Sequence, residues 1–270
     1  MPRKKARNKR KLSLKERRKR ARIFTLVVGV VAVVSTLVFG ILGLRSPEIN
    51  ITQVEVSGGV YTREDLVHRV VSEMLDGSYF FLVPHSNTFL YPKSHIQKEL
   101  SELFVSLESV SIRRNGLTAL EVALHDRTPS ALWCTSFEEG APCYFLDENG
   151  LVFTRAADVP SGLLVFSGEL SDQPLGEHYL AGAYANIVSL LSNIQTATRR
   201  TPEKVSIDAH DDISVFFKEG GEVRFTQKNA DNFLLDNIAS VFASRRFKTD
   251  EQLDYADFRF GSKVYVKFRE

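Results

Sequence analysis

Residues 23–44 read IFTLVVGVVAVVSTLVFGILGL, a run of 22 residues without one charged side chain. A helix rises about 1.5 Å per residue, so about 20 apolar residues cross the roughly 30 Å hydrocarbon core of a bilayer. A charge at that depth costs a few kcal/mol, and this run avoids that cost altogether. The sequence therefore predicts one transmembrane helix over residues 23–44.

The residues before this run are strongly basic. Residues 1–22 hold thirteen Lys or Arg and one acid, Glu16, a net charge of +12. Short basic flanks stay in the cytoplasm, so we expect residues 1–22 to be a basic cytoplasmic tail and residues 46–270 to lie outside. A cleaved signal peptide is the alternative, but its apolar core is usually about 7–15 residues long and ends in a small-residue cleavage site.

Attraction to anionic membrane lipid accounts for the tail's cations, which argues against nucleic-acid binding. Residues 23–270 have the opposite charge balance, with 22 Lys or Arg against 32 Asp or Glu, a net of −10. The part beyond the helix is therefore not expected to seek anionic polymers. Its length suits one large domain or two ordinary ones.

Residues 47–127 show the pattern of a small domain. Residues 51–56 end in the apolar alternation of a half-buried strand, and Asn115-Gly116 between two alternating runs is a strong hairpin signal. Thr62 and Ser94 are placed to cap two helices between them. The residues expected to face the core from these helices are Leu66, Val67, Val70, Val71, Met74 and Leu75, then Ile96, Leu100 and Leu103. The predicted order is β-α-α-β-β, one small sheet with two helices on one face.

This order, directly after a membrane helix, resembles the POTRA domain of the bacterial division proteins FtsQ and DivIB. The resemblance rests on residues 54–58 (VEVSG) with 62–66 (TREDL), on the hairpin of residues 110–122, and on Arg127-x-Pro129-x-Ala131-x-Trp133. Residues 144–153 (YFLDENGLVF) are similar to a hairpin of the same family. Gly59 departs from the commoner Gly-Asn pair at the first turn. The resemblance implies a POTRA domain over residues 47–127 and an FtsQ-type β-domain over residues 128–270.

Residues 128–270 read as a mostly antiparallel β-domain with two helices. Hairpins are indicated at residues 147–150, 219–221 and 261–262, and helices over residues 181–194 and from an Asn229 cap to about residue 244. The residues expected to face inward from the helices are Tyr184, Ile187, Val188, Leu191 and Ile194, then Phe233, Leu234, Ile238, Val241 and Phe242. The fold class is therefore α+β, with an N-terminal transmembrane helix.

The sequence carries no recognisable catalytic signature. The G-x-S-x-G, H-E-x-x-H, G-x-x-x-x-G-K-[ST] and G-x-G-x-x-G motifs do not occur. Residues 208–212 (DAHDD) are read as a turn rather than a metal site, Glu138-Glu139 as a solvated loop, and Trp133 as a core residue. We therefore expect no catalytic residue, cofactor, metal or small-molecule substrate.

Cys134 and Cys143 flank an eight-residue loop between two candidate antiparallel strands. Opposed strand residues bring their Cα atoms within the roughly 4.4–6.8 Å that a disulfide needs. Both cysteines lie in the part expected outside the cytoplasm, where a disulfide persists. A Cys134–Cys143 bond is the favoured interpretation, and two buried reduced thiols are the alternative.

With no active site in view, we expect a role in recognition. Resemblance to the family implies that the last strand pairs with a strand from small coiled-coil division proteins (FtsB/FtsL-like). The residues selected for this contact are Arg259, Phe260, Lys263 and Tyr265. The aromatic residues here could instead be core, since the sequence does not say which face of the last strands is buried.

Three functions are compatible with these features. The favoured one is a non-enzymatic scaffold of the cell-division machinery, held in the inner membrane at the septum and in contact with lipid and protein partners. The second is a POTRA-type transport or assembly component, although residues 128–270 lack the long strand series of a membrane barrel. The third is a membrane-tethered cell-wall enzyme.

Overall fold

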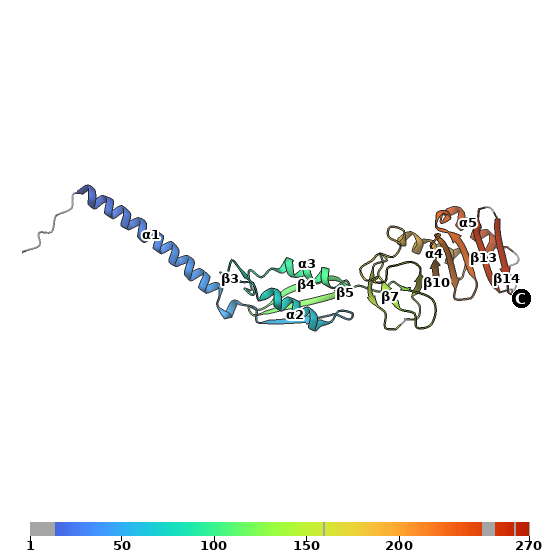
Figure 1. The fold of residues 1–270 in the computed structure, drawn as a ribbon, viewed down its shortest axis with the longest axis horizontal. Helices are drawn as coiled ribbons and strands as arrows, with labels where there is room; N and C mark the ends of the chain where they lie inside the picture. The colour runs from blue at the N-terminus through green and yellow to red at the C-terminus, as the bar shows by residue number, and fades with distance from the viewer. Residues whose placement is uncertain (1–13, 159, 245–251, 262, 270) are drawn as a thin grey trace, which may run out of the picture. The chain divides into compact units, whose positions relative to one another are not determined.

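The computed structural model describes residues 14–158, 160–244, 252–261 and 263–269 (Figure 1). Most of the predicted basic tail, residues 1–13, lies outside the described residues. The first element is helix α1, Leu14–Leu44. Its segment Arg18–Leu44 is long and apolar enough to cross a membrane, and its most apolar stretch is not buried by any other described residue. The helix therefore begins before the predicted residue 23 and ends at the predicted Leu44.

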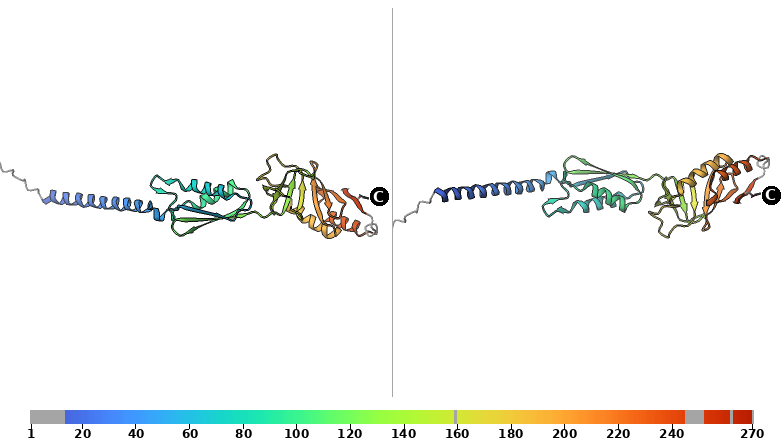
Figure 2. Two further views of the ribbon diagram at one scale, coloured as in Figure 1. Left: turned by 90° about the horizontal axis from the view of Figure 1, so that it is seen from below. Right: turned by 90° about the horizontal axis from the view of Figure 1, so that it is seen from above.

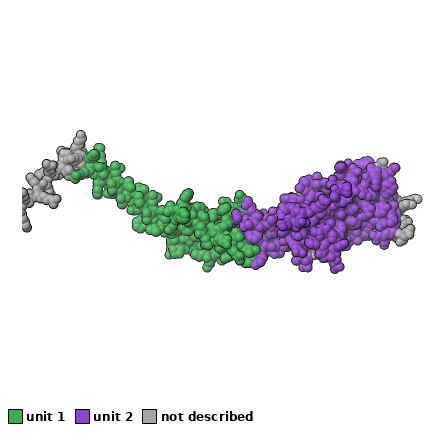
Figure 3. Space-filling view, viewed as in Figure 1, with its two compact units in different colours: residues 1–57, 64–98, 111–123 green, residues 58–63, 99–110, 124–270 purple. Residues whose placement is uncertain are grey.

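The chain divides into two compact units, coloured separately in Figure 3. Unit 1 comprises residues 1–57, 64–98 and 111–123, and unit 2 comprises residues 58–63, 99–110 and 124–270.

A small sheet follows α1 and the short 3-10 helix η1, Pro47–Ile49. Its strand order is β1-β5-β4, and β1 runs parallel to β5 with Gln53 opposite Ala119. Helices α2 and α3 lie on one face of this sheet (Figure 2), and the short strands β2 and β3 pair with each other between them. The bounds are β1 Gln53–Ser57, α2 Glu64–Leu75, β2 Ser78–Tyr79, β3 Val83–Pro84, α3 Lys93–Leu103, β4 Leu107–Asn115 and β5 Ala119–Asp126.

The predicted helix caps in this region are wrong. Helix α2 begins at Glu64, and Thr62 is instead buried, with its hydroxyl 2.6 Å from Ser106 Oγ and donating to Asp126 Oδ1 at 3.0 Å. Helix α3 begins at Lys93, so Ser94 lies inside it. Leu103, expected in the core, is exposed because the chain leaves the helix at that residue.

Unit 2 contains a nine-stranded sheet of order β14-β13-β12-β11-β10-β9-β6-β7-β8. This large sheet and the separate helices make the protein α+β, as predicted. The bounds are β6 Ala131–Cys134, β7 Cys143–Leu146, β8 Val152–Arg155, β9 Leu164–Ser167, β10 Pro202–Ile207, β11 Asp212–Phe217, β12 Glu222–Thr226, β13 Leu253–Phe260 and β14 Lys263–Phe268.

The sheet is more mixed than expected, because helices connect two of its parallel pairs and the strands β7 and β8 connect a third, β6–β9. The pairs β6–β9, β9–β10 and β12–β13 are parallel, among antiparallel neighbours. Helix α4, Tyr184–Thr198, joins β9 to β10, and α5, Asn232–Phe242, joins β12 to β13. Parallel neighbours need such a crossover, since a tight turn can only reverse the chain.

Both crossover helices differ from the sequence prediction in their limits and in one inward residue. Helix α4 begins three residues later than expected, with Val188 exposed and Leu190 buried. Helix α5 is capped by Asp231, whose Oδ1 accepts the Leu234 N–H at 3.0 Å, rather than by Asn229. Phe233 is 63% exposed, because the cap at Asp231 places it on the solvent side of the first turn.

Candidate functional site

Strand β14 forms one edge of the large sheet. In the described part of the chain its only strand neighbour is β13, with which it pairs in antiparallel register at Ala256↔Val266 and Asp257↔Tyr265. Among the described residues, no strand pairs with the other side of β14. An open edge of this kind either needs protection or recruits another chain.

The side chains of β14 alternate between core and solvent. Val264, Val266 and Phe268 are half-buried and pack against the main core of unit 2. Lys263, Tyr265 and Lys267 point the other way and are exposed. This alternation answers the question that the sequence left open, namely which half of the strand faces inward.

Three of the four selected residues form one exposed surface, which we call the β14 patch: Phe260, Lys263 and Tyr265. Phe260 and Tyr265 are 55% and 52% exposed, and their rings meet edge to face with centroids 5.2 Å apart. Phe260 lies directly opposite Lys263 across the β13–β14 turn. Exposed aromatic rings of this kind are typical of protein interfaces.

Arg259, the fourth selected residue, is held within the protein. Its guanidinium pairs with Asp257 at 2.7 Å and with Asp212 on β11 at 2.6 Å. Burial alone would raise the pKa of Asp257, but hydrogen bonds from Arg259 hold that pKa below its ordinary value. The bonds to both carboxylates raise the pKa of Arg259 in turn. Arg259 therefore supports the patch from within the sheet, with its guanidinium 5.7 Å from the Phe260 ring centroid.

The outer end of β14 carries a second, more exposed charge cluster. Lys267 and Arg269 lie 3.1 and 3.7 Å from the Asp254 carboxylate. The hydrogen bond from Lys267 is the main reason that the pKa of Asp254 lies below its usual value. These exposed pairs add positive charge along the open edge and little stability.

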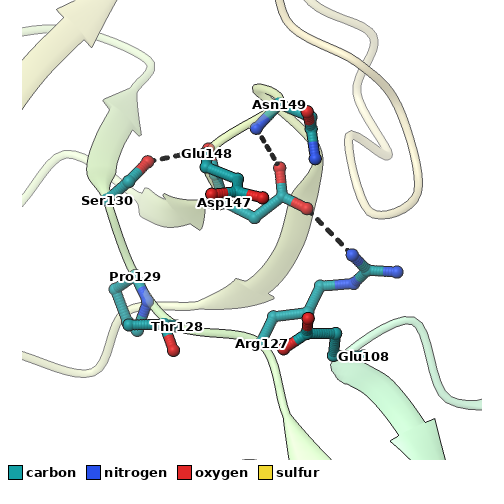
Figure 4. Close-up of a pocket in the computed structure, with 8 residues that line it drawn as sticks. All are labelled: Glu108, Arg127, Thr128, Pro129, Ser130, Asp147, Glu148 and Asn149. Carbon is teal, nitrogen blue, oxygen red and sulfur yellow. Dashed lines mark hydrogen bonds and ion pairs between the residues drawn. The ribbon is translucent and has the colours of Figure 1, made fainter.

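A polar pocket lies elsewhere in unit 2, where β5 leads into β6 (Figure 4). Arg127 Nη1 meets Asp147 Oδ2 at 2.9 Å, and Arg127 Nε donates to the Val105 carbonyl at 3.0 Å. Asp147 Oδ1 accepts the N–H groups of Asn149 and Leu151, which fixes the β7–β8 turn. Both carboxylate oxygens are thus engaged, and the pocket acts as a structural clasp.

Cys134 and Cys143 form a disulfide across the β6–β7 pair, with their Cα atoms 4.1 Å apart. Trp133 beside it is 3% exposed and donates its indole N–H to the Gly168 carbonyl, so it belongs to the core, as predicted.

The Asp-rich segment, residues 208–212, forms a turn. Asp208 Oδ1 accepts the N–H groups of His210 and Asp212, and those backbone bonds, with that to Asp212 first, lower the pKa of Asp208. Within the described residues, no three His, Cys, Asp or Glu side chains are grouped so that they could hold a metal ion.

Sequence reasoning missed the two carboxylates that fix Arg259. Asp257 could have been found, because residues two apart on a strand share a face. Asp212 gives no such local signal, since it lies 47 residues away in the chain. No family model matches the chain, and no curated protein matches it.

Proposed function

We propose that the chain is a membrane-anchored, non-enzymatic scaffold that binds a partner protein through the β14 edge. Helix α1 crosses the membrane with its basic end in the cytoplasm, in keeping with the preference of basic flanks for that side. Unit 2 then works outside the cytoplasm. Its contribution is to hold a partner rather than to transform a substrate.

The open side of β14 carries this proposal. An incoming strand gains main-chain hydrogen bonds on the side of β14 that no described strand occupies, and the exposed alternate side chains supply specificity. The inner residues of β14 are packed on the core, so the edge is already ordered before a partner arrives. A preformed edge lowers the entropy cost of binding.

The partner and setting come from the resemblance to FtsQ and DivIB. The POTRA-like order of residues 47–127 and the closing strands favour a role at the division septum, with an FtsB/FtsL-like coiled-coil protein as the added strand. Fluorescent fusion of the full chain tests the setting. A band at midcell is expected, and a uniform signal around the cell would exclude a division role.

Charge reversal on the edge tests the docking surface. Lys263→Glu in the full chain should weaken binding of the FtsB/FtsL-like partner, because the β14 patch loses its cation. Arg155→Glu is the matched control, since Arg155 is also an exposed cation but lies on β8, the strand at the other edge of the sheet. Equal binding by both variants would show that the partner docks elsewhere.

A further inference from the structure

Unit 1 has an exposed aromatic turn that the proposed function does not use. Tyr79, Phe80, Phe81 and Leu82 join β2 to β3, and we call these residues the aromatic tip. Phe80 and Phe81 are 90% and 89% exposed, and neither makes a ring contact with another described aromatic residue. Two adjacent phenylalanines in open solvent are unfavourable, so this surface needs a physical explanation.

The backbone of the tip makes these phenylalanines more unusual still. Leu82 N–H donates to the Tyr79 carbonyl at 2.9 Å, which closes a tight turn, and its two central residues have φ of 50° and 61°. Left-handed backbone at both central positions favours Asn-Gly, because Cβ clashes with the following carbonyl oxygen there; Gly has no Cβ, and Asn offsets the cost by local hydrogen bonding. The chain accepts this strain and displays two aromatic rings.

The tip is fastened to the end of α1. Arg45, the residue after the helix, donates from Nε to the Leu82 carbonyl at 2.8 Å and from Nη2 to the Phe81 carbonyl. Asn87 donates from Nδ2 to the carbonyl of Leu44, the last residue of α1, at 2.9 Å. These contacts hold the tip beside the point where the apolar helix ends.

That point lies at a membrane surface if α1 spans the bilayer. The uncharged run of 22 residues covers about 33 Å at about 1.5 Å per residue, close to the thickness of the hydrocarbon core. Leu44 then lies at the outer boundary and Arg45 among the lipid headgroups. A tip tied to both residues is at the same depth.

The neighbouring surface has the composition of a membrane interface. Phe89 and Leu90 are also exposed, and the Tyr79 hydroxyl donates to the Leu90 carbonyl at 3.0 Å. Arg114 stacks on the Phe89 ring at 5.4 Å from its centroid and can reach lipid phosphate. Aromatic rings flanked by cations are enriched where a protein meets headgroups and acyl chains.

We infer that the aromatic tip inserts Phe80 and Phe81 into the outer face of the same bilayer that α1 crosses. The occupant of this apolar surface is lipid, because the surface is continuous with the membrane helix through Arg45. Arg45 satisfies two tip carbonyls that water no longer reaches after insertion. This inference rests on the membrane anchor of the proposed function, but not on the β14 edge.

Brominated lipid tests insertion directly, because bromine on the acyl chains quenches an indole that enters them. The full chain carrying Phe81→Trp is reconstituted in phosphatidylcholine vesicles with and without acyl-chain bromine, and Phe80→Trp provides a second probe. Val60→Trp is the control. Val60 is 81% exposed, and its N–H donates to Asp126, the last residue of β5. The N–H of Thr52, which follows Arg45 in the chain, donates to the Thr118 carbonyl at the other end of β5.

Quenching and a blue shift at position 81 or 80, without quenching at position 60, would support insertion. Chains that float with the vesicles but show no bromine quenching at either tip position would overturn it and leave the anchor intact. Chains that fail to float would overturn the anchor and the insertion together. Quenching at position 60 as well would show general adsorption and would also overturn the inference.

The turn allows a further control that separates insertion from folding. Phe80→Asn with Phe81→Gly suits the left-handed backbone, so the fold is kept while the rings are lost. Both chains carry Leu82→Trp as the fluorescent probe. Bromine quenching of this probe should be several-fold stronger when Phe80 and Phe81 are retained than when they are replaced by Asn and Gly. Equal quenching in the two chains would show that the phenylalanines do not drive insertion.

Discussion

The aromatic tip and the β14 patch both expose aromatic rings, but the backbone beneath them differs. The patch lies on the β13–β14 pair, whose register shifts between Asp257 and Phe260, and β14 packs every second side chain on the core and has no second described strand beside it. The tip is a strained turn in which Leu82 N–H and Arg45 bind the carbonyls of Tyr79, Phe81 and Leu82. A strand edge suits an added strand, whereas a turn whose carbonyls are bound within the protein suits lipid.

Removal of the disulfide should have the largest effect on stability. It also tests whether the β14 patch and the aromatic tip work without the crosslink. Cys134→Ser with Cys143→Ser removes a crosslink over nine residues, and the free energy of unfolding should fall by about 2–3 kcal/mol. Binding at β14 and insertion of the tip should both persist below the unfolding temperature. Urea denaturation measures the loss, and reductant should reproduce it in the unmodified chain without affecting the variant.

Tyr265→Ala should affect only the β14 patch. Truncating an exposed aromatic anchor at an interface costs about 2 kcal/mol, or roughly thirtyfold in Kd for the partner. Tyr61→Ala is the matched control, since Tyr61 is an exposed tyrosine whose ring contacts Phe145 on β7 and Phe153 on β8, at the other end of the sheet. Titration calorimetry measures both. Similar affinities for the two variants would contradict a binding role for the β14 patch.

Arg259→Ala tests the support beneath the patch. It leaves the nearly buried Asp257 carboxylate without its guanidinium partner, so the free energy of unfolding should fall by about 1–2 kcal/mol. Arg259→Lys keeps the charge but not the forked hydrogen bonds. Its free energy of unfolding should lie between those of the unmodified chain and Arg259→Ala. Partner binding should weaken less than with Tyr265→Ala, because Arg259 acts through the sheet.

The same ion pair predicts a dependence on pH. The folded-state pKa of Asp257 is depressed. The stabilisation from its carboxylate is therefore complete above the unfolded-state pKa of about 3.9, and it is lost as pH falls through the folded-state pKa. The stability difference between the unmodified chain and Arg259→Ala should therefore be constant near neutral pH and shrink on acidification. The decrease should begin above about pH 4, because burial raises the pKa of Asp257 once Arg259 is removed. A difference that does not change with pH would contradict the ion-pair explanation.

The smallest expected effect is at the tip. Phe80→Asn with Phe81→Gly relieves two left-handed phenylalanines, and the free energy of unfolding in detergent should rise by about 1 kcal/mol or less. A loss of stability would mean that the rings pack within the protein. In that case the tip would not differ from the β14 edge as a surface for lipid rather than for an added strand.

The sequence allowed the local features of the fold to be predicted and not the distant pairings. The uncharged run of residues 23–44 and the alternation of Val264, Tyr265 and Val266 follow from period and composition alone. The parallel β12–β13 pair joins segments separated by α5, and no local pattern marks it.

Errors at helix ends have a similar origin. Asn229 and Asp231 are both good caps, and only tertiary packing selects Asp231. The exposure of Phe233 follows from that choice. At the candidate site, the choice of aromatic and basic residues on the last strands came from the family resemblance and stays a prediction. The Arg259–Asp212 pair could not be predicted, because it depends on how β11, β12 and β13 align.

Photocrosslinking in living cells tests the docking role of β14 most directly. A benzophenone amino acid is placed at position 265 on β14 and, in a second strain, at position 155 on β8, the strand at the other edge of the sheet. We predict that position 265 captures an FtsB/FtsL-like protein and that position 155 does not. Capture of that protein from position 155 alone, or from neither position in cells that are dividing normally, would contradict partner binding at the β14 edge.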